Sequence, residues 1–174
     1  LSRDAFTRLR YFKEGGVPHR FVCGSQNDPH TIERIGAYCR ASAMVNRLNM
    51  STCGAFGGRG MGQTCGVADP SQWMAVFGVD IDSRDTTLLL ETARAVTPAE
   101  IEAARAHIQP YFSVPIPADP ASERSIRLYV ALKQLVAQEG WDFYTIQSFP
   151  GLGDDYSATC FAQSMMVQDG VPTA

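Results

Sequence analysis

Apolar residues recur along this chain with two different periods, which together predict alternating strands and helices. Short apolar or alternating runs predict strands at 21–23, 53–56, 79–82 and 142–146. Apolar residues spaced three or four positions apart predict helices over about 29–48, 70–77, 98–108, 120–139 and 155–168.

Each helix is expected to bury one apolar face. In the first helix this face consists of Ile32, Ile35, Cys39, Ala43 and Leu48. In the second it is Trp73, Val76 and Phe77, and in the third Ile101, Ala104 and Ile108. The fourth has the longest stripe, formed by Ile126, Tyr129, Leu132, Leu135 and Val136. Residues at such spacings share one side of a helix and therefore form a core-facing stripe.

Start and stop signals bound these helices. A proline at the first helical position follows a capping residue at Asp28, Asp69, Thr97 and Asp119. Glu100 stands three residues after Thr97, which is the spacing of a capping box. Glycines at 78, 140 and 170 are typical helix stops.

The order of these elements predicts the fold class. Alternating helices and short apolar strands are typical of a mostly parallel sheet with helices on both faces. We therefore expect a three-layer, Rossmann- or flavodoxin-like α/β domain that covers residues 1–174. Ligands of such sheets bind beyond the carboxyl ends of the strands, which here means the segments 57–62 and 147–155.

Composition narrows the classes of function. The chain has 174 residues, 45% of them hydrophobic, and a net charge of −3. An acidic balance without a basic run argues against nucleic acid as a partner. The longest apolar runs are far shorter than a membrane span, which needs about 20 residues, so no membrane association is expected. The odd count of five cysteines, with no C-x-x-C pair, predicts buried, reduced thiols and a cytoplasmic location.

The glycine-rich turn at 57–62 leaves several interpretations open. Its glycines allow close backbone packing, and its N–H groups together with Arg59 could bind an anion or a hydroxyl group. The dinucleotide pattern G-x-G-x-x-G fails by one residue, because Gln63 stands where the last glycine is required. Cys65 could be a nucleophile only with a nearby base, and the three histidines are scattered and expected at the surface or in caps.

Three segments carry a family resemblance. They are Phe56-Gly57-Gly58-Arg59-Gly60-Met61-Gly62 with the following residues 69–80, the strand and loop at 141–150, and Asp169-Gly170-Val171-Pro172-Thr173-Ala174. Together they resemble the second, central domain of the L-fucose isomerase and L-arabinose isomerase-like family. The resemblance is firmest over 54–82 and 141–174.

The resemblance implies a function that the chain shares with other domains. Family members interconvert aldoses and ketoses with a Mn²⁺-type metal that polarises the sugar oxygens. Their metal-binding Glu would follow Ala174, so we expect a domain fragment that is inactive alone and holds neither metal nor catalytic residues. By alignment, Gln147 is a candidate for binding the sugar hydroxyls; Arg59 is our second candidate. The implied partners are a monosaccharide, the remaining domains of the parent chain and further copies in a homo-oligomer.

Two other functions remain open. The chain could be a sugar-binding or regulatory α/β module without chemistry, or a nucleotide-binding α/β domain. A continuation beyond Ala174 into Cys/Thr-Glu-x-Asp would favour the isomerase, and stabilisation by NAD or ATP would favour the nucleotide-binding domain.

Overall fold

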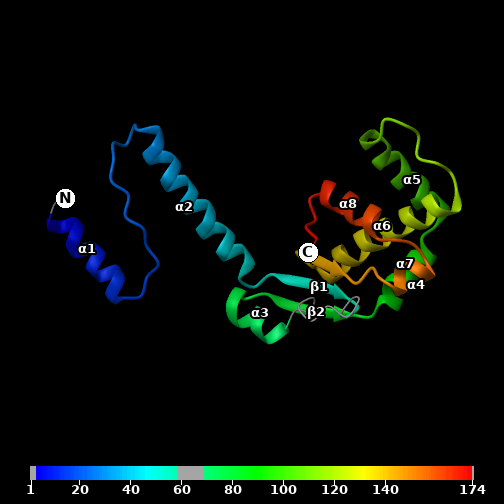
Figure 1. Ribbon diagram of the computed structural model, residues 1–174, viewed down its shortest axis with the longest axis horizontal. Helices are drawn as coiled ribbons and strands as arrows, with labels where there is room; N and C mark the ends of the chain where they lie inside the picture. The colour runs from blue at the N-terminus through cyan, green and yellow to red at the C-terminus, as the bar shows by residue number, and fades with distance from the viewer. Residues whose placement is uncertain (1–2, 59–68, 174) are drawn as a thin grey trace. The chain divides into compact units, whose positions relative to one another are not determined.

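A computed structural model describes residues 3–58 and 69–173 (Figure 1). For residues 3–8 it describes the backbone alone. The chain divides into two compact units, Leu1–Arg47 and Leu48–Ala174. The single domain expected over residues 1–174 stays a prediction.

The first unit consists of two helices, α1 (Arg3–Glu14) and α2 (Pro29–Leu48). The start of α2 is fixed as its sequence indicates, because the Asp28 carboxylate accepts hydrogen bonds from the backbone N–H and the hydroxyl of Thr31, at 3.1 and 2.7 Å. Tyr38 on α2 donates to the carbonyl of Pro18 at 2.9 Å and so attaches the preceding loop.

Two expectations for this unit are wrong. Residues 21–23 form no strand, and Phe21 is 41% exposed. An apolar triplet forms a strand of a sheet only when a neighbouring strand pairs with its backbone groups. The apolar stripe of α2 is also exposed, with Ile32 at 55% and Ile35 at 49%.

The second unit contains the sheet, which confirms the expected α/β class. Its strands are β1 (Thr52–Phe56), β2 (Asp80–Arg84) and β3 (Phe143–Ile146), all parallel, in the order β2-β1-β3. Gly54 on the central strand is in register with Asp82 on one side and Tyr144 on the other. Thr173 forms an isolated parallel bridge with Tyr144, which agrees with the strand expected near the end of the chain.

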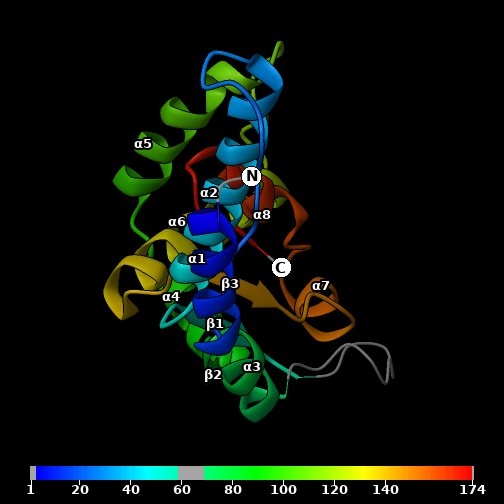
Figure 2. The same cartoon turned by 90° about the vertical axis from the view of Figure 1, so that its left-hand side faces the viewer.

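Helices connect the strands. They are α3 (Pro70–Phe77), α4 (Thr86–Ala95), α5 (Pro98–Ile108), a short 3-10 helix (Gln109–Tyr111), α6 (Pro120–Glu139), α7 (Gly151–Asp155) and α8 (Cys160–Gln168). Because parallel crossovers are right-handed, the connection from β1 to β2 and the connections after β2 cover opposite faces of the sheet. Figures 1 and 2 both show α3 beside β2.

The predicted caps form as expected. Asp69 and Asp119 accept backbone N–H groups at the starts of α3 and α6, and Gly78 and Gly140 end these helices in the left-handed region. Thr97 and Glu100 form a complete capping box on α5. These signals are local, so they can be read from the sequence without knowledge of the packing.

The core of the second unit surrounds α6. This helix packs against α4, α5 and α8, and its predicted stripe is buried (Figure 1). Ile126 and Leu132 are 0% exposed, and Tyr129 is 1% exposed. Phe56 and Tyr144 extend this core onto the sheet.

Other expectations for this unit need correction. The predicted inner face of α3 is largely in solvent, because Val76 is 70% and Phe77 49% exposed, and Trp73 is only half-buried. The single helix expected over about 155–168 is two helices, α7 and α8, and Asp155 is the last residue of α7. Helix α4 was not predicted at all.

The described cysteines differ in their exposure. Cys53 is buried, which raises the pKa of its thiol to about 11, as expected for an inert core cysteine. The expectation of burial is wrong for Cys23, Cys39 and Cys160, which are exposed free thiols.

Within the described ranges, no helix combines the length and the apolar character needed to cross a bilayer.

A close contact at the central strand gives the first prediction. A Cβ atom at Gly54 would lie 2.2 Å from the ring of Trp141, which is 4% exposed. We expect Gly54→Ala to lower the free energy of unfolding by about 1–3 kcal/mol, because neither the strand nor the buried ring can move away cheaply. Urea unfolding followed by circular dichroism measures this change.

Gly151→Ala is the matched control, since a Cβ there meets no atom within 4 Å. It should change the stability by less than about 0.5 kcal/mol. Equal effects of the two substitutions would contradict the proposed clash.

Candidate functional site

The carboxyl ends of the strands bring Gln147 next to the turn after β1. The backbone N–H of Gln147 donates to the carbonyl of Phe56 at 2.9 Å, and its side-chain Oε1 accepts from the N–H of Gly58 at 2.7 Å. Its Nε2 donates to the carbonyl of Phe149 at 3.4 Å. The amide of Gln147 therefore binds the backbone at the start of the glycine-rich turn.

Gly57 allows this contact. It has a φ of +80°, and a Cβ at this position would lie 2.8 Å from Oε1 of Gln147. Both observations require glycine, because an L side chain would be strained and would displace the amide. The remainder of the turn, including Arg59, and the cysteine at position 65 lie outside the described residues. The predictions for Arg59 and Cys65 therefore stay predictions.

The described part of this edge is polar, and few of its side chains could act as a general acid or base. Asp85 follows β2 and caps α4 by accepting from the N–H of Thr87 at 2.8 Å. This backbone hydrogen bond lowers the pKa of the Asp85 carboxyl, so the group is ionised at neutral pH. Ser148 follows Gln147 and accepts from the N–H of Thr159 at 3.4 Å. Amide, hydroxyl and backbone groups of this kind suit the binding of hydroxyl-rich ligands.

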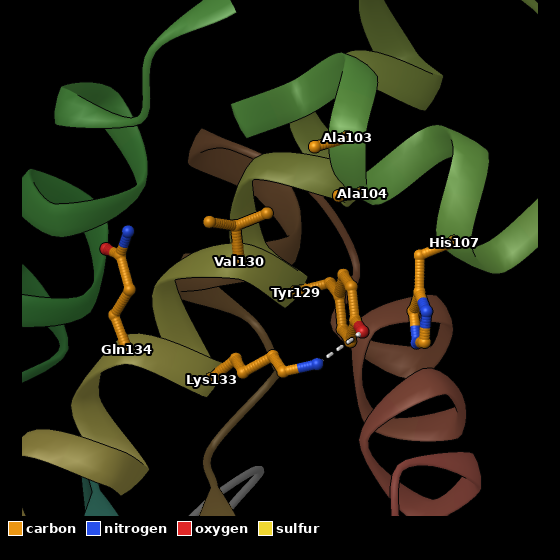
Figure 3. Close-up of a pocket in the computed structure, with 7 residues that line it drawn as sticks. All are labelled: Ala103, Ala104, His107, Tyr129, Val130, Lys133 and Gln134. Carbon is orange, nitrogen blue, oxygen red and sulfur yellow. Dashed lines mark hydrogen bonds between the residues drawn. The ribbon is translucent and has the colours of Figure 1, made fainter. Parts of the chain in front are cut away.

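A second polar arrangement lies in the helical layer, where four side chains from distant parts of the chain meet. Asp169, at the end of α8, accepts hydrogen bonds from Nζ of Lys133 at 2.6 Å and from the hydroxyl of Tyr129 at 2.5 Å. Nε2 of His107, at the end of α5, lies 2.9 Å from the other carboxylate oxygen. We call these four residues the Asp169 cluster. Figure 3 shows Lys133, Tyr129 and His107 gathered on one side of a cavity between α5 and α6.

The electrostatics of the Asp169 cluster keep its groups in fixed charge states. Burial alone would raise the pKa of Asp169, but the hydrogen bonds from Lys133, Tyr129 and His107 outweigh it and lower the pKa to about 2. Burial, together with the hydrogen bond to Asp169, raises the pKa of Tyr129 to about 12. The hydrogen bond to Asp169 also raises the pKa of Lys133. At neutral pH the cluster thus holds a carboxylate, an ammonium and a neutral phenol.

The sequence patterns do not predict the Asp169 cluster. They place His107 at the surface or in a cap, and Tyr129 in the core stripe of α6. One signal was available, since Tyr129 and Lys133 are four residues apart and share a face of α6. Nothing local connects them to Asp169, which is 36 residues beyond Lys133.

The metal implied by the family resemblance can be tested against the residues present. Among the described residues, no three His, Cys, Asp or Glu side chains come together in a way that could hold a metal ion. Within the Asp169 cluster only two side chains are of these types, and the lysine ammonium occupies the carboxylate. The described residues therefore do not fit a Mn²⁺ centre, and no reaction step of this chain is derived from one.

The fold is an α/β domain with a parallel sheet, and the described residues after its strands are polar. Comparison of the sequence with models of known protein families gives no match, and no curated protein matches it either.

The Asp169 cluster predicts a pH-dependent contribution to stability. Because the pKa of Asp169 is about 2 in the folded protein and 3.8 ordinarily, its contribution is complete above about pH 4 and is lost as the pH falls through 2. Since Lys133 is half-exposed and its charge is screened by solvent, Asp169→Asn should lower the free energy of unfolding at pH 7 by about 1–2 kcal/mol. Denaturant unfolding between pH 7 and pH 2 tests this, and the variant should lose less stability than the original chain below pH 4.

Asp155→Asn serves as the control, because Asp155 is an exposed carboxylate at the end of α7. It should leave both the stability at pH 7 and its decline in acid nearly unchanged. The prediction is refuted when the two variants respond to pH alike.

Proposed function

We propose that this chain is the central α/β domain of a metal-dependent aldose–ketose isomerase and presents substrate-contacting loops at the carboxyl edge of its sheet. The metal ligands and the carboxylates that move the proton would come from other domains or other copies, because the described residues bring no such set together. The ligand at this edge would be a monosaccharide. The chain by itself would bind sugar weakly and would not isomerise it.

The observation that carries this proposal is the hydrogen bond between Gly58 and Gln147. These residues come from two separate segments that resemble the same family domain, and they are 89 positions apart. Their meeting at the edge where α/β sheets bind ligands supports a shared site. The third segment adds to this support, since Thr173 pairs with Tyr144 on the strand that leads to Gln147.

The chemistry of the edge also favours a sugar over a charged ligand. An amide both donates and accepts hydrogen bonds, which matches the hydroxyl groups of a sugar. Asp85, which follows β2 at this edge, is ionised and would repel a phosphate. This argues against the nucleotide-binding alternative, while the non-catalytic sugar-binding module would use the same edge.

The test is an NMR titration of the ¹⁵N-labelled chain with aldoses and ketoses such as L-fucose and L-arabinose. We expect saturable shifts of the Gly57, Gly58 and Gln147 signals. Gln147→Glu keeps an oxygen that accepts from Gly58 but loses the amide donors, and it should weaken sugar binding about 5-fold or more. The fold should be retained, because the contact with Gly58 remains possible.

Gln168→Glu, at an exposed position at the end of α8, is the control and should bind sugar as the original chain does. Shifts at the edge with ATP or NAD instead of sugars would overturn the proposal in favour of a nucleotide site. Sugar binding that a partner domain plus Mn²⁺ fails to turn into isomerisation would favour the non-catalytic module.

A further inference from the structure

The start of α6, the loop before it and the start of α8 surround a cavity in the helical layer. Its volume is about 220 Å³, and the described residues that line it are Ile116, Ala121, Ser122, Ser125 and Phe161. An apolar cavity of about 150 Å³ is large enough to bind benzene, so this one has room for a small molecule. None of these lining residues belongs to the carboxyl edge of the sheet.

Three of the lining side chains form apolar walls. Ile116 and Phe161 also pack against the core of the second unit, and Phe161 stacks on Phe112 with ring centres 6.0 Å apart. None of the described lining residues carries a charge. Because an ion loses its hydration beside such walls and finds no charged partner there, the cavity suits a neutral ligand with an apolar body.

Two side chains hold the wall formed by Ile116 in place. Nη1 of Arg105 on α5 donates to the carbonyls of Ile116 and Pro117 at 3.2 and 2.9 Å. Oε1 of Gln109 accepts from the backbone N–H of Ile116 at 2.9 Å. The loop is thus ordered before a ligand binds, which lowers the entropic cost of binding.

The hydroxyl of Ser125 has no hydrogen left for a ligand. It donates to the carbonyl of Ala121 at 3.1 Å and lies 3.0 Å from the hydroxyl of Ser157. A serine hydroxyl has one hydrogen to donate and two lone pairs that accept. Its hydrogen is used in one of these two contacts, so Ser125 keeps at least one lone pair for a ligand.

The hydroxyl of Ser122 is used in a similar way. The backbone N–H of Ser122 donates to the Asp119 carboxylate at 2.8 Å, and its hydroxyl bonds to the same group; both contacts lower the pKa of Asp119. An ionised carboxylate only accepts hydrogen bonds, so the hydroxyl is the donor. Both hydroxyls in the cavity therefore offer acceptors alone, and a ligand must bring the donor.

We propose that this cavity binds a small neutral aromatic alcohol, with its ring against Ile116 and Phe161 and its O–H donating to the hydroxyl of Ser125. A ring beside Phe161 gains energy from offset or edge contacts in addition to its burial. A carboxylate or a ketone has no hydrogen to donate, and an ammonium ion finds no carboxylate among the described lining residues.

The experiment is an NMR titration of the ¹⁵N-labelled, full 174-residue chain with phenol. Phenol should shift the signals of Ala121, Ser122, Ser125 and Phe161 in a saturable way, with a Kd of about 1 mM, which is within the range for so small a ligand. Toluene has a similar shape but no hydroxyl, and it serves as the comparison ligand for the variants. Benzoate is charged and only accepts hydrogen bonds, so it should bind about 10-fold more weakly than phenol or not at all.

The first pair of variants tests the place of binding. Ala121 is exposed, so Ala121→Leu fills the cavity without changing the core, and it should weaken the binding of phenol and toluene about 10-fold or more. Ala137→Leu, at an exposed position of α6 that does not line the cavity, is the matched control and should bind both ligands as the original chain does.

The second pair tests the hydrogen bond. Ser125→Ala removes the acceptor and keeps the apolar walls, so the ratio of the phenol affinity to the toluene affinity should fall about 5-fold. Ser157→Ala leaves the Ser125 hydroxyl in the cavity, still donating to Ala121, and should keep this ratio.

The proposal is overturned when phenol causes no saturable shifts at the lining residues, when benzoate binds as tightly as phenol, when Ala121→Leu binds like Ala137→Leu, or when Ser125→Ala leaves the affinity ratio unchanged. None of these results depends on sugar binding at Gln147, which Gln147→Glu probes separately. The monosaccharide proposal and the aromatic alcohol proposal can therefore fail independently.

Discussion

The contact of the Trp141 ring with the backbone of Gly54 is the constraint on which the second unit depends. The ring is buried two residues before β3, and it covers the central strand at a glycine because any side chain there would overlap it. Its Nε1 donates to Asp82 on β2 at 2.9 Å, and its edge meets Phe56 with ring centres 5.4 Å apart. One side chain thus contacts β1 and β2 and lies two residues before β3, so it connects the three strands.

A series of polar contacts connects Trp141 to the helical layer. Asp82 also pairs with Arg84 at 2.9 Å, and Arg84 reaches Glu139 at the end of α6 at 2.7 Å. The indole, a carboxylate and a guanidinium therefore connect the sheet to the helix that organises the core. Because α6 in turn packs against α4, α5 and α8, its position determines where His107 and Asp169 lie relative to Lys133.

The sequence predicts what is decided locally and fails where partners are distant. Asp69, Thr97 and Asp119 start their helices as expected, because a cap needs only the next few residues. The sequence does not predict helix α4, because its cap, Asp85, is followed by neither a proline nor a capping-box Glu. Strand formation at 21–23 and burial of Val76 depend on neighbours that the apolar pattern cannot identify. At the site, topology correctly predicted the edge where Gln147 lies, but not its bond to Gly58.

The two polar arrangements differ in a way that follows from their places in the fold. At the carboxyl edge, backbone N–H groups emerge from strand ends and are matched by a neutral amide, so Gln147 meets Gly58 without net charge. In the helical layer the backbone groups in the middle of each helix are paired within it, so the polar contacts between helices come from side chains, and partly buried charges need partners. Asp169 satisfies this need for Lys133 while its own position is fixed by the turn that leads to Thr173 and β3. The polar groups at the carboxyl edge and the charged Asp169 cluster in the helical layer are therefore both products of one sheet-and-helix arrangement.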